Sequence, residues 1–398
     1  MPHIAEAVKR NPAIIRSPFH EQFQTLVIDP LRHRQGRVIL VFDAIDECKS
    51  ARQRKDLLDT LAVAVRESEN LRIFITSRPD PVIETVLQPL SIKTELRDRL
   101  HDVKHRENID DIATYVHRSL EGVLSKDRRQ QLVERAKGLF IWASTACRML
   151  KDEATLNTPE SIFDGLISAG QNGAIDDVYD LVFERIDPGS HTTLCSMLAL
   201  LLAVFEPLTT DDLDDLLKQV GVYGSAKALV RNLGSVLTED QMTKMIQFRH
   251  PTLVEYLRRR CINPSTDNSR RIYLDIAEAH GRAASWCLKC LKSLLKFNIC
   301  EIESSFSLNS QIPDLAERIS KCVPLRLQYA SSHWLFHVAE IDVDQRHTLK
   351  NELRYVIRSP YVLYWMEILS VIGRVPRVIA GLRAVTRHAG VSGVFQDF

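Results

Sequence analysis

The sequence is poor in glycine and lacks the glycine-rich motif that cradles phosphate groups. Its 398 residues include 15 glycines, the first of which is Gly36, and no glycine is followed by a lysine. The motif G-x-x-x-x-G-K-[ST] of a phosphate-binding loop is therefore missing from the chain. Such a loop supplies several backbone N–H donors and a lysine. Without about four of these bonds, at roughly 1.5–3 kcal/mol each, nucleotide affinity falls at least ~10⁴-fold.

Long hydrophobic runs and an excess of one charge are also missing. The longest apolar run, Met197–Phe205, is far shorter than the ~20 residues needed to cross a bilayer. The 52 basic and 51 acidic residues leave a net charge of +1, which gives no general attraction to nucleic acid or to a membrane. Met1–Pro12 has polar residues where a signal peptide would be apolar, so we expect a cytoplasmic protein.

Cysteines are present but show no disulfide pattern. The eight cysteines are scattered along the chain, as expected for free thiols in a reducing compartment. Cys287 and Cys290 form a C-x-x-C pair with His280 upstream, but a structural zinc site needs a second pair of ligands. Two core cysteines on one face of a helix are the simpler interpretation, with zinc as the alternative.

Two short apolar runs near the N-terminus predict neighbouring strands of a parallel sheet. Arg37–Phe42 and Leu71–Thr76 are apolar on both faces, which is typical of strands buried inside such a sheet. Gln53–Glu67 has helical spacing between them, and Ile92–Leu96 is a shorter strand candidate. This alternation of strand and helix predicts an α/β fold for about the first hundred residues.

The rest of the chain is predicted to be almost entirely helical. Apolar residues recur at helical spacing in most of it, including the runs Arg128–Leu150, Leu315–Val338 and Tyr361–Val385. Gly170–Gly173 and Pro264–Asn268 have the composition of linkers. We find no repeat of about 20–50 residues, which argues against a solenoid or a propeller.

Acidic side chains follow the first strand, and an arginine follows the second. Asp43, Asp46 and Glu47 come directly after Phe42 with the spacing Asp-x-x-Asp-Glu. An Asp at the carboxyl edge of a sheet can hold Mg²⁺, and a nearby acidic residue can orient or deprotonate an attacking water. Arg78, after the second strand, could contact a γ-phosphate. The alternatives are aspartates that cap the next helix and a surface arginine in a loop.

Taken together, the two segments resemble a known family. Val38–Cys48 and Arg72–Pro81 are similar to the Walker B and sensor-1 segments of NACHT domains, the signalling NTPases of the STAND class. The resemblance is strongest to fungal NOD-like receptors and nephrocystin-like NTPases. Four later segments resemble the family's helical domain, its adenine-side turn, and the opening and closing of its winged helix: Asp110–Val116, Gly138–Ala143, Glu206–Leu213 and Phe248–Leu257.

The resemblance implies a fold class and a domain order. The fold would be an α/β remnant of a P-loop NTPase, with a parallel sheet missing its P-loop strand, followed by mostly α-helical domains including a winged helix. In the family the P-loop strand lies between the two strands found here, so these either pair directly or leave exposed edges. The implied domains are a partial nucleotide-binding domain (Walker B and sensor 1 only), a helical domain, a winged helix and a C-terminal helical arm, at residues 1–100, 101–172, 173–263 and 270–398.

The resemblance also implies roles for particular side chains. Asp43 would bind Mg²⁺, Asp46 and Glu47 would position water, and Arg78 would sense the γ-phosphate of ATP. His250 would sense the β-phosphate of ADP. The alternative for His250, a satisfied histidine at the start of a helix, is slightly favoured because the phosphate-binding loop is missing.

The predicted function follows from these roles. The chain resembles an N-terminally truncated NACHT/STAND signalling NTPase, a nucleotide-regulated switch of the fungal NOD-like receptor type, that is not catalytically competent alone. The intact family uses ATP or ADP with Mg²⁺, whereas weak or no binding is expected here. We expect protein partners, with a second copy of the chain as one candidate, and neither a membrane nor a specific nucleic acid. The alternatives are a nucleotide-independent helical interaction scaffold and an ATPase completed by an upstream exon.

Overall fold

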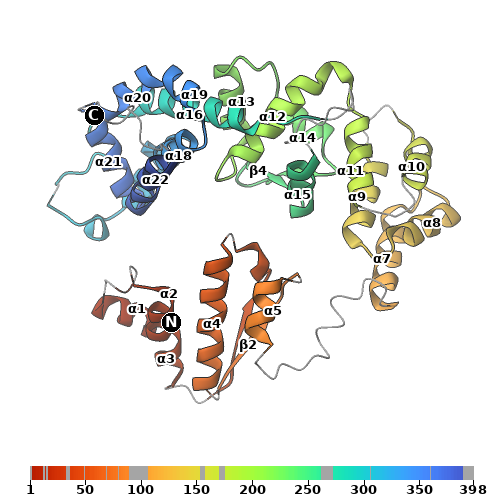
Figure 1. Ribbon diagram of the computed structural model, residues 1–398, viewed down its shortest axis with the longest axis horizontal. Coiled ribbons are helices and arrows are strands. Elements are labelled where there is room, and N and C mark those ends of the chain that lie inside the picture. Colours follow the sequence, from red (N-terminus) through yellow and green to blue (C-terminus); the bar gives the residue numbers. More distant parts are fainter. Residues whose placement is uncertain are drawn as a thin grey trace. The chain divides into compact units, whose positions relative to one another are not determined.

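In the computed structural model, the chain folds into two compact units, Met1–Asp102 and Val103–Phe398 (Figure 1). The structure describes residues 2–11, 14, 17–32, 36–48, 50–68, 70–78, 80–88, 106–152, 157–169, 175–260, 272–304, 306–358 and 360–388. Ile92–Leu96, Gly170–Gly173 and Pro264–Asn268, for which a strand and two linkers were predicted, lie outside these residues.

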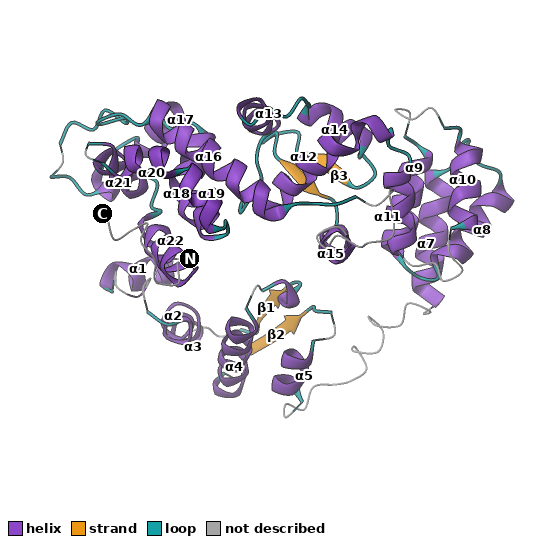
Figure 2. Cartoon of the chain, turned by 45° about the horizontal axis from the view of Figure 1, so that its top comes forward, coloured by secondary structure: helices purple, strands orange, loops and turns teal. Residues whose placement is uncertain are grey.

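A two-stranded parallel sheet lies at the centre of the first unit. Strands β1 (Val38–Phe42) and β2 (Leu71–Ile75) pair over their whole length, with Phe42 opposite Ile75 (Figure 2). Helix α4 (Ala51–Glu67) is the crossover that a parallel pair requires. The prediction of two parallel strands is confirmed. The strands pair with each other directly, which was one of the two arrangements expected without the P-loop strand.

Helices pack on one face of this sheet. The core brings Phe23 and Ile28 together with Leu61 of α4 and Leu71 of β2, and alternate residues of both strands pack against them. The remaining helical segments of the unit are short: α1 (Pro2–Arg10), α2 (Phe19–Phe23), η2 (Gln24–Ile28), α3 (Asp29–Arg32), η3 (Ile45–Glu47) and α5 (Pro81–Leu87).

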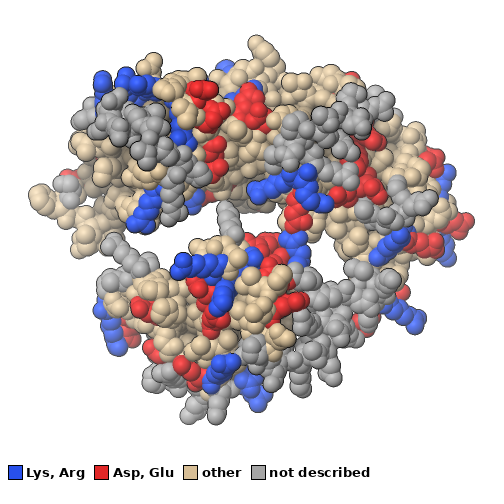
Figure 3. Space-filling view, viewed as in Figure 1, with Lys and Arg blue, Asp and Glu red and all other residues tan. Residues whose placement is uncertain are grey.

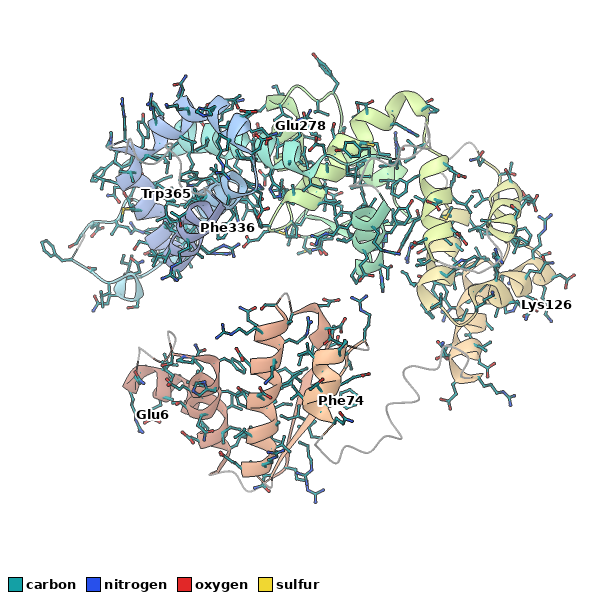
Figure 4. All side chains as sticks on the ribbon, viewed as in Figure 1. Glu6, Phe74, Lys126, Glu278, Phe336 and Trp365 are labelled. Carbon is teal, nitrogen blue, oxygen red and sulfur yellow. The ribbon has the colours of Figure 1, made fainter. Side chains whose placement is uncertain are left out.

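The opposite face of the sheet is largely exposed. Ile39, Val41 and Phe74 keep 66%, 64% and 41% of their surface exposed, whereas their neighbours Leu40 and Ile73 pack into the core. Figure 4 marks Phe74 on β2. The prediction that both faces are buried is therefore wrong for the described residues, because their helices pack only against the alternate set of strand side chains.

The second unit begins with a group of helices: α7 (Arg106–Ser119), α8 (Lys126–Ala136), α9 (Phe140–Leu150), α10 (Pro159–Ser168) and α11 (Ile175–Glu184). The prediction of a single helix over Arg128–Leu150 is wrong, because two helices, α8 and α9, occupy this range. Lys137 and Gly138 have φ values of 47° and 80°, and a positive φ ends a right-handed helix. The chain therefore turns between α8 and α9.

The next segment places helices before and after a β-hairpin. Strands β3 (Leu237–Glu239) and β4 (Ile246–Phe248) pair antiparallel. The helical segments around them are η4 (Pro188–Ser190), α12 (His191–Ala203), α13 (Thr210–Gln219), α14 (Ala226–Asn232) and α15 (Pro251–Arg260). Helices followed by a hairpin match the order expected of a winged helix, whose identity stays a prediction.

The C-terminal part of the second unit is again helical. Its elements are α16 (Ile276–Leu294), η5 (Asn309–Gln311), α17 (Leu315–Cys322), α18 (Leu325–Ala339), α19 (Val343–Thr348), α20 (Lys350–Ile357), α21 (Tyr361–Val371) and α22 (Val375–His388). Two of the predicted long helices are interrupted. Pro324 precedes α18, and Gly373, with a φ of 68°, separates α21 from α22. Both residues are poor helix formers.

Large side chains from these helices form an extended core. Trp286, Trp334 and Trp365 are buried within it, and Figure 4 labels Trp365. Cys287 and Cys290 are also buried, and burial raises the pKa of the Cys290 thiol to about 12. These thiols therefore stay protonated at neutral pH. Among the described helices, none has the combination of length and apolarity that crossing a membrane requires.

Candidate functional site

The tips of the two parallel strands lie at one edge of the sheet in the first unit. The residues after Phe42 and Ile75 leave the sheet side by side, because β1 and β2 are parallel and in register. Two backbone hydrogen bonds join the tips. The Thr76 N–H donates to the Phe42 carbonyl over 3.0 Å, and the Ile45 N–H donates to the Thr76 carbonyl over 3.0 Å. The acidic segment and the arginine segment therefore share one edge.

Thr76 links the first carboxylate to the second strand. Its hydroxyl donates a hydrogen bond to Asp43 Oδ1 and accepts one from the backbone N–H of Ala44 over 2.8 Å. Ala44 has a φ of 51°, a left-handed conformation that is uncommon for a residue with a Cβ. The chain turns sharply here, between the exposed Asp43 side chain and the short helix η3.

Asp46 and Arg78 form an ion pair that is held by two hydrogen bonds. Arg78 Nε donates to Asp46 Oδ2 over 2.7 Å, and the Arg78 backbone N–H donates to Oδ1 over 3.0 Å. The Asp46 side chain is 10% exposed, whereas that of Arg78 is 54% exposed. Partial burial acts to raise the pKa of Asp46, but the hydrogen bonds and charge of Arg78 outweigh it and lower the pKa below the ordinary value. Asp46 is therefore a carboxylate at neutral pH.

Arg54 fastens the acidic segment to the loop after β2. Its guanidinium donates to the backbone carbonyls of Asp46 and Cys48 over 3.0 and 2.8 Å, and to Asp80 Oδ2 over 3.0 Å. Asp80 in turn caps α5, because its Oδ1 accepts from the backbone N–H groups of Val82 and Ile83. Neither Arg54 nor Asp80 is among the residues predicted from the sequence, although the Asp80-Pro81 dipeptide is a recognisable signal for a helix start.

The remaining acidic residue, Glu47, ends η3 and is exposed. Within the described residues, no group of three His, Cys, Asp or Glu side chains could hold a metal ion by itself. Mg²⁺ commonly uses only one or two carboxylates and takes its other ligands from water and phosphate. The exposed carboxylate of Asp43 fits that kind of partial site.

His250 belongs to the second unit and lies at the start of α15. Its Nδ1 accepts a hydrogen bond from the Thr252 backbone N–H over 3.2 Å and lies 2.8 Å from Thr252 Oγ1. The Thr252 hydroxyl also pairs with the buried Tyr179 hydroxyl over 2.7 Å. Because Nδ1 accepts, the ring proton of a neutral His250 lies on Nε2. This geometry matches the expected satisfied histidine at a helix start, whereas its predicted contact with ADP stays a prediction.

Comparison with known proteins gives one family match. The family described as "Nephrocystin 3, N-terminal" matches residues 1–78, which is about a fifth of the chain. The matched region contains β1, α4 and β2 and ends at Arg78, so it includes all four residues at the strand tips: Asp43, Asp46, Thr76 and Arg78. No curated protein and no solved structure matches the chain.

Proposed function

We propose that this chain is a NACHT-like signalling module in which the strand-tip cluster (Asp43, Asp46, Thr76 and Arg78) responds to a magnesium nucleotide without hydrolysing it. The observation that carries the proposal is the pair of Asp46 and Arg78 at the shared edge of the sheet. The family match over residues 1–78 supports it independently.

The pair provides the chemistry of a switch. Asp46 holds the Arg78 guanidinium, which is half exposed and can exchange its carboxylate partner for a phosphate. Mg²⁺ on Asp43 would offset the repulsion between the acidic segment and the phosphates. A phosphate on Arg78 would free Asp46 and thereby loosen the connection between the two strand tips.

The missing phosphate-binding motif argues against efficient catalysis. No G-x-x-x-x-G-K-[ST] motif occurs in the chain, so the backbone cradle that positions the phosphates has no counterpart here. Two further proposed roles rest on the family resemblance alone: Asp46 and Glu47 would position water, and His250 would sense ADP. So does the finer assignment to STAND-class receptors of the fungal NOD-like type.

Nucleotide titration tests the proposal directly. The full chain would be titrated with fluorescently labelled ADP and ATP, with and without Mg²⁺. We expect magnesium-dependent binding that weakens at least about tenfold in Asp43→Ala, because a charge-assisted metal contact is lost. Asp56→Ala is the matched control, since Asp56 is an exposed aspartate on α4 that does not belong to the strand-tip cluster. Absence of binding at millimolar nucleotide would refute the switch.

The second candidate is a nucleotide-independent interaction scaffold. It is favoured by the internal pairing of the strand-tip cluster, in which Thr76 engages Asp43 and Arg78 engages Asp46. For a scaffold, Asp46→Asn and Arg78→Gln should change stability slightly and leave nucleotide affinity undetectable. The same titration therefore separates the two candidates.

A further inference from the structure

A basic pocket lies in the C-terminal part of the second unit. It has a volume of about 450 Å³ and is formed by α20 and the start of α21. Its lining residues are Asn351, Arg354, Tyr355, Arg358 and Tyr361. Figure 3 shows Lys and Arg atoms gathered over the part of the second unit where Figure 1 labels α20.

The polar groups of this pocket are mainly hydrogen-bond donors. Among the described residues, neither Arg354 nor Arg358 has an ion-pair partner, and no carboxylate lines the pocket. The Tyr355 hydroxyl donates to the Tyr361 hydroxyl, which leaves the Tyr361 proton available to another acceptor. The Asn351 amide adds two further N–H donors.

A third cation is held beside the pocket by an aromatic ring. Lys292 of α16 places Nζ 4.7 Å from the centroid of the Tyr355 ring, within the range of a cation–π contact. The Tyr361 ring packs against Tyr355 with a centroid distance of 4.4 Å. The Tyr355 ring is therefore occupied by two neighbours, so we do not expect it to stack on a nucleobase. What the pocket offers a ligand is positive charge and N–H or O–H groups.

We propose that this pocket binds a small ligand that carries several phosphate groups. Arginine forks match phosphate oxygens in a bidentate manner, and two of them line this pocket with no carboxylate partner among the residues that the structure describes. The volume is far larger than a single phosphate needs and lies within the range of small-molecule sites. A ligand with acceptor groups only satisfies the donors of the pocket better than a peptide or a neutral metabolite does.

Calorimetric titration of the full chain at low salt and without Mg²⁺ tests this proposal. The two probes are sodium tripolyphosphate and myo-inositol hexakisphosphate, which distinguish an inorganic chain of phosphates from phosphates on a carbon ring. We expect one or both to bind with a stoichiometry of about one, as a single pocket requires. Failure of both probes to bind at millimolar concentration would overturn the proposal.

Variants of the two arginines locate the binding. Arg354→Gln with Arg358→Gln should weaken binding at least about tenfold, since charge-assisted hydrogen bonds are lost. Arg354→Lys with Arg358→Lys should retain part of the affinity, because the charge stays while the fork is lost. Arg383→Gln is the matched control, since Arg383 is an exposed arginine of α22 outside the pocket. Equal weakening by the control, or none by the double Gln variant, would overturn the proposal.

A further variant separates this site from the strand tips. Without Mg²⁺, on which the proposed phosphate contact of Arg78 depends, Arg78→Gln should leave tripolyphosphate binding unchanged, because Arg78 does not line the pocket. If Arg78→Gln abolished the binding while the double Gln variant kept it, the phosphate site would lie at the strand tips, and the basic pocket would be excluded.

Discussion

Three histidines surround the Phe205 ring in the second unit. His280 lies on α16, and His333 and His337 lie on α18, with ring centroids 4.9–5.7 Å from that of Phe205. A hydrogen-bonded chain connects two of them. The Phe205 N–H donates to the Tyr329 hydroxyl, which lies 2.8 Å from His337 Nε2, and His337 Nδ1 lies 2.9 Å from His280 Nδ1. Such a buried network is stable only while the rings are neutral.

The third ring, His333, lies between opposite charges. Arg377 Nη2 donates to His333 Nδ1 over 3.1 Å, and Glu206 Oε1 lies 3.3 Å from Nε2. A guanidinium can only donate, so Nδ1 is unprotonated and the ring is neutral. Burial, followed by the charge of Arg377, lowers the pKa of His333 to about 4, although Glu206 opposes the shift. Burial also lowers the pKa values of His280 and His337.

These shifts predict that acid destabilises the second unit. A histidine whose pKa is lowered on folding gives its full stability above its unfolded value of about 6.5 and loses it towards the folded value. For His333 the free energy of unfolding should fall by up to about 1.4 kcal/mol per pH unit between pH 6.5 and 4. The pKa of Glu206 is also lowered, although burial acts to raise it, so its contribution declines only below about pH 4.5.

Urea unfolding at pH 7, 6 and 5, followed by tryptophan fluorescence, measures this dependence. The variant His333→Gln should be less stable at pH 7, because the Arg377 contact changes, but it should lose less stability on acidification. An unchanged slope in this variant would assign the pH dependence to other groups.

Arg54 connects two segments of the first unit through its side chain. Its side chain is 14% exposed and joins three acceptors from two segments. Arg54→Ala should destabilise the first unit by about 2–4 kcal/mol, because it leaves the partly buried Asp80 without its charge partner. Arg52→Ala, an exposed neighbour on the same helix, should change stability by less than about 0.5 kcal/mol. Urea unfolding followed by circular dichroism compares the two, and similar losses would show that the Arg54 contacts contribute little.

Single residues set the ends of several helices. Three runs predicted as continuous helices are divided by Gly138, Pro324 and Gly373. The apolar spacing continues through each break because both flanking helices face the same core. Periodicity therefore identified the helical segments, while the backbone conformation of a few residues set their ends.

Two glycine variants test whether backbone conformation sets the helix ends. Gly373 has a φ of 68° after α21, where an L-residue is strained, so Gly373→Ala should destabilise the protein by about 1 kcal/mol. Gly165 lies inside α10, and an added Cβ would meet only Leu181 Cδ2 at an ordinary 3.7 Å. Gly165→Ala should therefore stabilise the protein by up to about 1 kcal/mol. Thermal unfolding distinguishes the two signs, and changes of equal sign would contradict the assigned conformations.

The two units have separate hydrophobic cores. Among the described residues, the core clusters of the first unit extend up to Leu87, and the large cluster of the second begins at Ile112. The four tryptophans, Trp142, Trp286, Trp334 and Trp365, all belong to the second unit. Fluorescence therefore reports on the second unit, while circular dichroism reports on both.

Two core variants should act on different transitions. Leu58 and Leu213 are 1% and 0% exposed, and each truncation to alanine should cost about 2–5 kcal/mol. Leu58→Ala should shift the circular dichroism transition of the first unit and leave the fluorescence transition unchanged, whereas Leu213→Ala should shift the fluorescence transition. If Leu58→Ala moved both transitions together, the units would unfold as one cooperative body.

Local sequence patterns were enough to predict two parallel strands, the acidic and arginine residues at their tips and the helical character of the remainder. These features follow from local periodicity and from residues that end a strand or a helix. The hydrogen-bond and ion-pair partners of the side chains, in contrast, depend on how distant segments pack together. Asp46 with Arg78 and Glu206 with Arg374 are separated by 32 and 168 residues, and no local pattern specifies such pairs. The exposure of one sheet face was likewise decided by packing, because it depends on which helices cover the strands.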